Sequence, residues 1–130
     1  MPWATVKERL RAQRIAAAGP DIDVLPASGL DGLAAVVSQA AAVVGVDTGL
    51  AHLAAALGIP SVTLYGATDP ELTGTVGEQQ HWLQAEYPCA PCRRRMCSKI
   101  PAGGESPPCY RDLPAERVWG ALEGLLVEAS

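Results

Sequence analysis

Apolar and polar residues follow two different patterns along the chain. Apolar residues spaced three or four apart predict helices over residues 5–19, 29–41, 49–58 and 114–129. Short runs rich in β-branched and aliphatic residues predict strands over residues 21–26, 43–47, 61–66 and 80–86. Residues 67–77 and 88–111 are rich in Pro and Gly and show neither period, so both are expected to be loops.

The alternation of these strands and helices predicts the fold class. Such alternation is typical of α/β proteins with a doubly wound, Rossmann-like parallel sheet. The run at 43–47 is apolar throughout, which predicts a strand buried on both faces of the sheet. The helix at 114–129 is expected to close the domain, with its inward face formed by Val118, Leu122, Leu125 and Leu126.

The sequence "VVGVDTGLAH" predicts a ligand site where the strand at 43–47 meets the next helix. We call residues 47–52 the Asp47 corner. Ligands of open parallel sheets bind beyond the carboxyl ends of the strands, where Asp47 falls. The unpaired N–H groups of a helix beginning near Thr48 suit an anion, and Gly49 lets it approach the backbone. Asp47 itself suits neutral hydroxyl groups, and His52 adds a donor. The same residues are also consistent with an N-cap and a packed helical histidine.

Length, charge and composition limit the function further. The 130 residues suffice for one domain, and the formal net charge of −4 argues against a nucleic-acid-binding protein. No apolar run reaches the ~20 residues that span a bilayer, and the start of the chain lacks the apolar segment of a signal peptide. The expected location is therefore cytoplasmic. Basic residues gather at 93–111, either as a solvated loop or as a surface that meets phosphates or a membrane.

Four cysteines lie within the loop at 88–111, with the spacing C-x2-C-x4-C-x11-C. They are Cys89, Cys92, Cys97 and Cys109. The first pair has the spacing of half a tetrahedral zinc site, but the second pair is wider than in zinc ribbons. A structural zinc and four free thiols fit the pattern equally well, and disulfides fit a cytoplasmic protein less well.

The stretch "VVGVDTGLAHLAAALGIPSVTLYGATDPELTG" closely resembles the C-terminal half of lipopolysaccharide heptosyltransferases, the type I enzymes in particular. These are inverting glycosyltransferases of family 9 with the GT-B fold. The likeness extends from "PWATVKERLRAQRIA" to "DLPAERVWGALEGLL" and so covers essentially the whole chain. It implies that residues 1–130 are a partial C-terminal, nucleotide-sugar-binding domain, with the cysteine-rich loop at 88–111 and the closing helix at 114–129.

The resemblance implies a donor site for ADP-heptose. Asp47 would contact the heptose hydroxyls, and His52 would line the same pocket. The backbone of Thr48, Gly49 and Leu50 would hold the diphosphate. Glu8 would bind the adenosine ribose, although its spacing from Thr5 equally fits a capping box. Ser28, with Ala27, would lie by the adenine. No cofactor is implied for the chemistry.

The family members are more than twice as long, so the chain is expected to be a fragment. The missing N-terminal domain would carry the catalytic base and the site for the Kdo-lipid A acceptor, at the inner face of the inner membrane of a Gram-negative bacterium. No catalytic residue is therefore expected in this chain, and the chain alone should bind donor weakly and transfer no heptose. A missing strand–helix unit would leave the strands at 22–25 and 43–47 without a partner between them. The chain should then pair these two strands or self-associate.

Two other functions are compatible with parts of the sequence. A related GT-B glycosyltransferase that uses another nucleotide sugar would have the same Asp47 corner. A zinc-binding cysteine module with affinity for nucleic acid is a more distant alternative, because the net charge is negative and the α/β pattern is strong.

Overall fold

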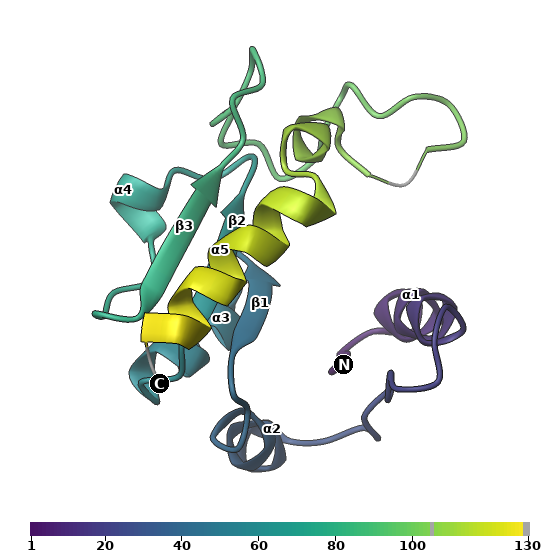
Figure 1. Ribbon diagram of the computed structural model, residues 1–130. Helices are drawn as coiled ribbons and strands as arrows, with labels where there is room; N and C mark the ends of the chain where they lie inside the picture. Colours follow the sequence, from purple (N-terminus) through teal and green to yellow (C-terminus); the bar gives the residue numbers. More distant parts are fainter. Residues whose placement is uncertain (105, 129–130) are drawn as a thin grey trace. The chain divides into compact units, whose positions relative to one another are not determined.

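The computed structural model describes residues 1–104 and 106–128. The chain divides into two compact units, Met1–Val36 and Val37–Ser130, each described by itself. Figure 1 shows the helices and strands in chain order.

The first unit contains α1 (Val6–Ala16) and most of α2 (Leu30–Val37), which confirms both predicted helices. A capping box begins α1. The Glu8 N–H donates to Thr5 Oγ1 at 3.3 Å, and Glu8 Oε2 accepts from the N–H groups of Ala4 and Thr5 at 2.8 and 2.9 Å. These backbone donors lower the pKa of Glu8, so its carboxylate stays ionised and stabilises the helix start.

The prediction of a strand at 21–26 is wrong. The backbone there bonds to the first three residues of the chain instead of to a sheet. The Leu25 N–H donates to the Met1 carbonyl at 3.0 Å, and the Met1 ammonium donates to the Asp23 carbonyl at 2.6 Å. The Trp3 indole N–H donates to the Leu25 carbonyl at 2.8 Å. These bonds occupy backbone N–H and C=O groups that a strand would use to pair with an adjacent strand. The expected pairing of 22–25 with 43–47 is therefore also wrong, and self-association stays a prediction.

The second unit is built on a three-stranded parallel sheet, as the fold class requires. Its strands are β1 (Val43–Val46), β2 (Ser61–Tyr65) and β3 (Gln80–Gln84), in the order β1-β2-β3. Val43 pairs with Ser61, and Ser61 pairs with Gln80. The helix α3 (Gly49–Ala56) connects β1 to β2, and α5 (Ala115–Glu128) closes the described part of the chain.

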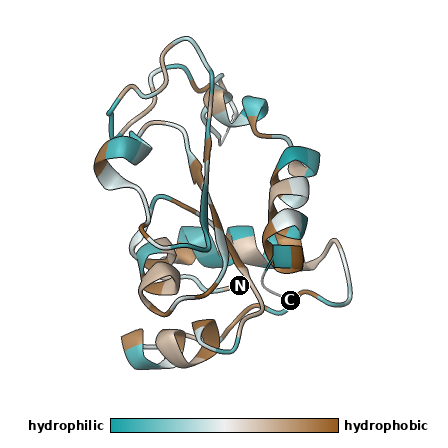
Figure 2. Ribbon diagram, turned by 60° about the vertical axis from the view of Figure 1, so that its left-hand side comes forward, coloured by the Kyte–Doolittle hydropathy of each residue, from teal (hydrophilic) through white to brown (hydrophobic). Residues whose placement is uncertain are grey.

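Helices cover both faces of β2, which makes it the central strand of the core. On one face Val62 and Leu83 form a hydrophobic cluster with α5 residues, namely Val118, Ala121, Leu122 and Leu125. On the other face α3 brings the fully buried Ala51 and Ala54 against the sheet, with the Ala51 methyl group next to Gly45. Figure 2 shows hydrophobic residues along the strands between these helices.

The expectation that 43–47 is buried on both faces is wrong for β1. Val44 is 46% exposed and Val46 is 41% exposed. Both residues point to the face of the sheet that carries α5, but α5 packs mainly on β2 and β3 and leaves the edge strand partly uncovered. The apolar run at 43–47 therefore predicted the strand correctly, but it did not predict that one face of the strand is exposed.

Two short helices interrupt segments that were predicted to be loops. Residues 70–73 form α4 (Pro70–Thr73), which Asp69 caps through a bond from the Glu71 N–H to Oδ1 at 3.1 Å. The loop at 88–111 is irregular except for the 3-10 helix η1 (Pro108–Asp112). Among the described residues, no helix combines the length and apolar character needed to cross a membrane.

We expect Thr63→Val to stabilise the second unit by up to about 1 kcal/mol. The Thr63 side chain is fully buried, and its hydroxyl has no hydrogen-bond partner among the described residues. Valine has nearly the same shape and removes that unsatisfied group. Urea unfolding measures the effect. The matched control is Thr75→Val, which should destabilise because the buried Thr75 hydroxyl accepts from Trp82 Nε1 at 3.2 Å. Equal destabilisation by both variants would refute the expectation.

Candidate functional site

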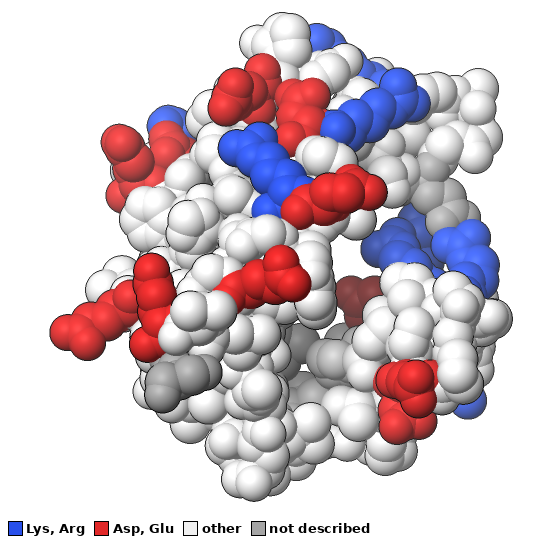
Figure 3. All heavy atoms as spheres, in the orientation of Figure 1, with Lys and Arg blue, Asp and Glu red and all other residues white. Residues whose placement is uncertain are grey.

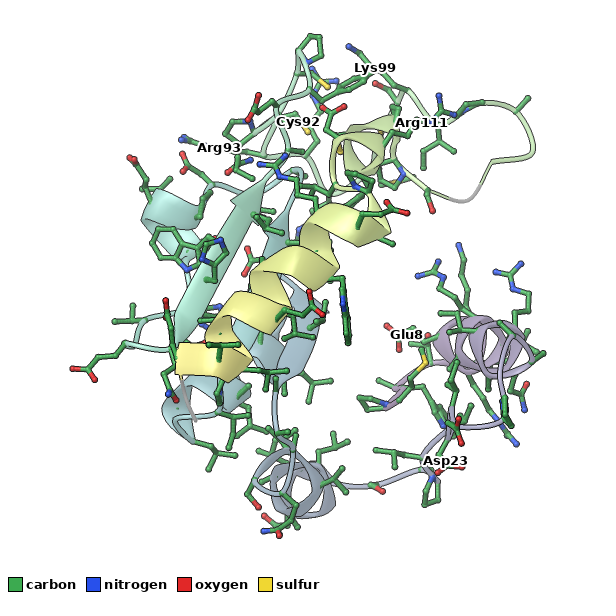
Figure 4. All side chains as sticks on the ribbon, viewed as in Figure 1. Glu8, Asp23, Cys92, Arg93, Lys99 and Arg111 are labelled. Atoms are coloured by element: carbon green, nitrogen blue, oxygen red, sulfur yellow. The ribbon has the colours of Figure 1, made fainter. Side chains whose placement is uncertain are left out.

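The three parallel strands end at the same edge of the sheet, and the candidate site lies there. Asp47 follows β1 directly, residues 66–69 follow β2, and the loop at 88–111 follows β3. Figure 4 shows Cys92 and Arg93 beyond the carboxyl end of β3. Because ligands of open α/β sheets bind at this edge, the location agrees with the predicted one.

Asp47 is held by side chains from two helices. Thr73, at the end of α4, donates its hydroxyl to Asp47 Oδ2 at 2.8 Å. His52 of α3 lies with Nε2 3.4 Å from Asp47 Oδ1. The Asp47 side chain is 13% exposed, whereas that of His52 is 47% exposed. The predicted grouping of Asp47 with His52 is therefore observed, and Thr73 joins them.

The surroundings of Asp47 keep its carboxylate ionised. Burial by itself raises the pKa of this carboxyl, but hydrogen bonds from Thr68, Thr73 and His52 outweigh it and hold the pKa below the ordinary value. Each oxygen of an ionised carboxylate can accept more than one bond. Asp47 can therefore still accept from hydroxyl groups of a ligand.

The start of α3 is open. Thr48 is the N-cap residue, with extended backbone angles of φ −145° and ψ 166°, but its hydroxyl makes no capping bond. Among the described residues, no group accepts from the N–H of Gly49 or Leu50. A Cβ added to Gly49 would have nothing within 4 Å. Two backbone donors and an open space therefore lie beside Asp47, as an anion site requires.

Glu8 and Ser28 belong to the first unit. The Glu8 carboxylate accepts hydrogen bonds from the backbone of Ala4 and Thr5. The capping box, which was the alternative to a ribose contact, is therefore observed. The Ser28 hydroxyl donates to the Pro26 carbonyl at 3.0 Å. Both residues are exposed. Their roles toward a nucleoside stay predictions.

A cavity of about 290 Å³ beside Thr73 was missed by the sequence interpretation. We call it the arginine pocket, and it is lined by Thr68, Asp69, Leu72, Thr73, Arg93, Arg94 and Arg95. Asp69 followed by Pro70 is a signal for a helix start that could have predicted α4. Nothing in the sequence predicts that residues 93–95, in the loop after β3, lie beside α4.

All four cysteines line one cavity of about 120 Å³, which we call the cysteine pocket. The four are free, and Cys109 is buried. Burial raises the pKa of the Cys109 thiol, and the other three cysteines raise it further. Within the described part of the chain, no three His, Cys, Asp or Glu side chains form a group that could hold a metal. Convergence of the thiols is thus observed, while zinc stays a prediction.

We expect Thr73→Val to raise the pKa of Asp47, because the valine removes a hydroxyl donor to the carboxylate. Carboxyl carbon shifts measured by NMR across an acid titration would detect the change. In the native protein the lowered pKa stabilises the fold above the ordinary carboxyl pKa, and this stabilisation is lost as the pH falls through the folded value. In Thr73→Val this stabilisation should be smaller, and its loss should be complete at a higher pH. Thr48→Val is the control, since the Thr48 hydroxyl makes no capping bond.

A parallel sheet with a carboxylate and an open helix start at its carboxyl edge places the chain among the doubly wound α/β proteins. The sequence profile of Glycosyltransferase family 9 (heptosyltransferase) matches residues 1–102. The chain belongs to this family, which confirms the resemblance found in the sequence.

Individual relatives agree with this assignment. Lipopolysaccharide heptosyltransferase 1 of Pseudomonas aeruginosa is 41% identical over an alignment of 136 positions, which covers 98% of this chain but 38% of the relative. The protein of the same name from Escherichia coli K12 is 48% identical over 80 residues, which cover 62% of this chain and 25% of the relative. The chain therefore spans well under half the length of these relatives.

Two solved structures are similar. E. coli heptosyltransferase WaaC with ADP matches with a TM-score of 0.63 at 46% identity, over 65% of this chain and 26% of that one. The same enzyme with ADP-2-deoxy-2-fluoro heptose gives a TM-score of 0.59 at 44% identity, over 65% and 25% of the two chains. The predicted fold class is confirmed by these matches.

Proposed function

We propose that this chain supplies the donor-binding part of an inverting heptosyltransferase that uses ADP-heptose. Family membership, the relatives named lipopolysaccharide heptosyltransferase 1 and the likeness to WaaC with ADP support this proposal. The single observation that carries it is the Asp47 corner, where an ionised carboxylate lies next to two free backbone donors.

Different groups of the Asp47 corner bind different parts of the donor. Asp47 repels phosphate but accepts hydrogen bonds from sugar hydroxyls. The N–H groups at the start of α3 receive the diphosphate, with Gly49 permitting close approach. His52 lines the sugar side, and Glu8 and Ser28 serve the nucleoside. The heptose then passes from ADP to an acceptor hydroxyl.

In this proposal the acceptor is Kdo-lipid A, and both its site and the general base lie outside this chain. The reaction takes place at the cytoplasmic face of the inner membrane of a Gram-negative bacterium. It requires no cofactor, because the leaving ADP is stabilised by backbone donors. The chain alone should bind donor weakly and transfer no heptose.

A ligand panel on the purified chain tests the proposal. We expect ADP-heptose and ADP to shift NMR signals of residues 47–52, whereas UDP-glucose should bind more weakly and require higher concentrations for the same shifts. Gly49→Val should weaken binding of both ADP ligands at least about tenfold by blocking the backbone donors. Gly124→Val is the matched control, because Gly124 in α5 also has open space around its Cα. Preference for a UDP sugar would instead support the related glycosyltransferase.

A structural zinc in the cysteine pocket is a second, independent proposal, supported by the convergence of all four cysteines on one cavity. The loop would have to close around the metal, since the described side chains are not in ligand geometry. Elemental analysis should then find about one zinc per chain. Four thiols that react with Ellman's reagent in the native, metal-free protein would contradict this proposal.

A further inference from the structure

The arginine pocket is an open cavity that shares a wall with the Asp47 corner. The shared residues are Thr73 and Thr68, which both line the pocket. The Thr73 hydroxyl donates to Asp47 Oδ2 at 2.8 Å, and Thr68 contributes to the lowered pKa of Asp47. A ligand whose hydroxyl groups reach Asp47 would therefore extend toward the pocket on the far side of these threonines. The chemistry of the pocket decides which part of a ligand it favours.

Arg93 fixes the loop against the sheet edge. Its Nη2 lies 2.8 Å from Asp69 Oδ2, and its N–H donates to the Ala67 carbonyl at 2.7 Å. Its backbone is left-handed, with φ 55°, a conformation that a non-glycine residue keeps only when its surroundings hold it. The Asp69 carboxylate is thus neutralised by Arg93 and also caps α4. The acidic group that lines the pocket is already paired.

Arg94 and Arg95 line the same pocket and carry charges that are not compensated. Both are exposed, and among the described residues neither forms an ion pair. Figure 3 shows basic and acidic side chains gathered at the top of the view, where Figure 4 labels Arg93. Two adjacent guanidinium groups at a concave surface with threonine hydroxyls match a phosphate or carboxylate.

Other cations of the loop have different surroundings. The Lys99 ammonium lies 5.8 Å from the centre of the Tyr87 ring. Arg111 lines a separate cavity of about 420 Å³, together with residues that include Pro101 and Tyr110. Among the described residues, the unpaired cations of the arginine pocket are therefore Arg94 and Arg95, which also line the cysteine pocket. Lys99 and Arg111 line neither pocket and provide controls of equal charge.

We infer that Arg94 and Arg95 form an anion-binding subsite, which takes a phosphate or carboxylate group of the ligand bound at Asp47. Arg93 is the positioning residue, since its pairing with Asp69 presents the next two side chains to the pocket. The anion bound by the two arginines lies on their side of Thr73, while the sugar hydroxyls lie on the Asp47 side. The identity of the ligand rests on the proposed function, but the binding of an anion does not.

Inorganic pyrophosphate is the probe for this subsite. The isotope-labelled chain is titrated at constant ionic strength, and shifts of Arg94, Arg95 and Thr68 are followed by NMR. We expect saturable shifts at these residues, and we expect Arg94→Gln/Arg95→Gln to weaken them about tenfold or more. Lys99→Gln/Arg111→Gln removes the same charge from the same loop and should change the affinity less than about twofold. Equal weakening by both double variants, or no saturable shift, would overturn the inference.

Competition then identifies the source of the anion. Displacement of pyrophosphate from the arginine residues by ADP would assign the subsite to the donor diphosphate. Displacement by Kdo-lipid A in detergent, but not by ADP, would assign it to the acceptor. Failure of both would overturn the link between the subsite and the ligand of Asp47. Failure of the proposed function is distinguishable, because ADP and ADP-heptose would then leave residues 47–52 unshifted while pyrophosphate still bound.

Discussion

Gly74→Ala is expected to destabilise the second unit by about 1–3 kcal/mol, at the upper end of that range. A Cβ at Gly74 would collide with the Pro70 carbonyl oxygen and with the Trp82 indole ring. Neither neighbour can yield easily. The Pro70 carbonyl accepts the Gly74 N–H at 2.8 Å, and the Trp82 indole donates to the Thr75 carbonyl at 2.9 Å.

The same substitution should weaken the site as well as the fold. Thr73 immediately precedes Gly74, and its hydroxyl bonds to Asp47. Displacement of the end of α4 should therefore loosen the carboxylate and raise its pKa. Urea unfolding measures the stability, with Gly120→Ala as control. Gly120 lies in α5, where an added methyl group would have nothing within 4 Å, so alanine there should be neutral or stabilise by up to about 1 kcal/mol. A Gly74→Ala protein as stable as the native one would refute the clash.

Local patterns predicted most of the second unit. β-branched runs identified β1 and β2, and the glycine and proline after α3 marked its end. Gly58 has φ +70°, the left-handed conformation that glycine favours at a helix end. The capping box at Thr5 and Glu8 could also be predicted from the sequence, because it depends on two residues three positions apart.

The strand predicted at 21–26 failed because pairing is not a local property. Residues 22–25 have strand-like composition, but their backbone groups bond to Met1 and Trp3, about 22 positions away. No spacing within the segment reveals that partner. The exposure of Val44 and Val46 has a similar origin, since burial of an edge strand depends on how far α5 reaches across the sheet.

The candidate site was predicted only as far as it is contiguous in sequence. Asp47 and His52 lie within one turn of a helix start, so their proximity follows from the helical period. Thr73 is 26 positions from Asp47 and is brought near it by the loop after β2. Arg93 is 24 positions from Asp69, and their ion pair depends on the return of the loop after β3. Contacts of this kind require the fold.

Asp47→Asn is expected to remove the contribution of the sugar to donor binding while leaving binding of the nucleotide intact. A hydrogen bond to a charged group contributes about 1.5–3 kcal/mol, so affinity for ADP-heptose should fall roughly ten- to a hundredfold. Affinity for ADP should stay the same or rise, because the substitution removes a negative charge next to the diphosphate. NMR titrations of the chain with both ligands measure the two affinities.

Two controls separate this role from a general loss of charge or of structure. Glu71→Gln removes one negative charge from the exposed surface of α4 and should change neither affinity. Urea unfolding of Asp47→Asn shows whether the fold survives the loss of the ionised partner of Thr73 and His52. A stable Asp47→Asn protein with unchanged affinity for ADP-heptose would remove Asp47 from the sugar site.

The pH dependence gives an independent test of the same role. The pKa of Asp47 lies below the ordinary value, because the bonds from Thr68, Thr73 and His52 outweigh the effect of burial. The preference of the native chain for ADP-heptose over ADP should therefore persist at mildly acidic pH. It should disappear only as the pH falls through the lowered pKa and the carboxylate becomes protonated. Thr73→Val should lose the preference at higher pH, and Asp47→Asn should lack it at every pH. A preference that is independent of pH in all three proteins would assign the sugar to other residues.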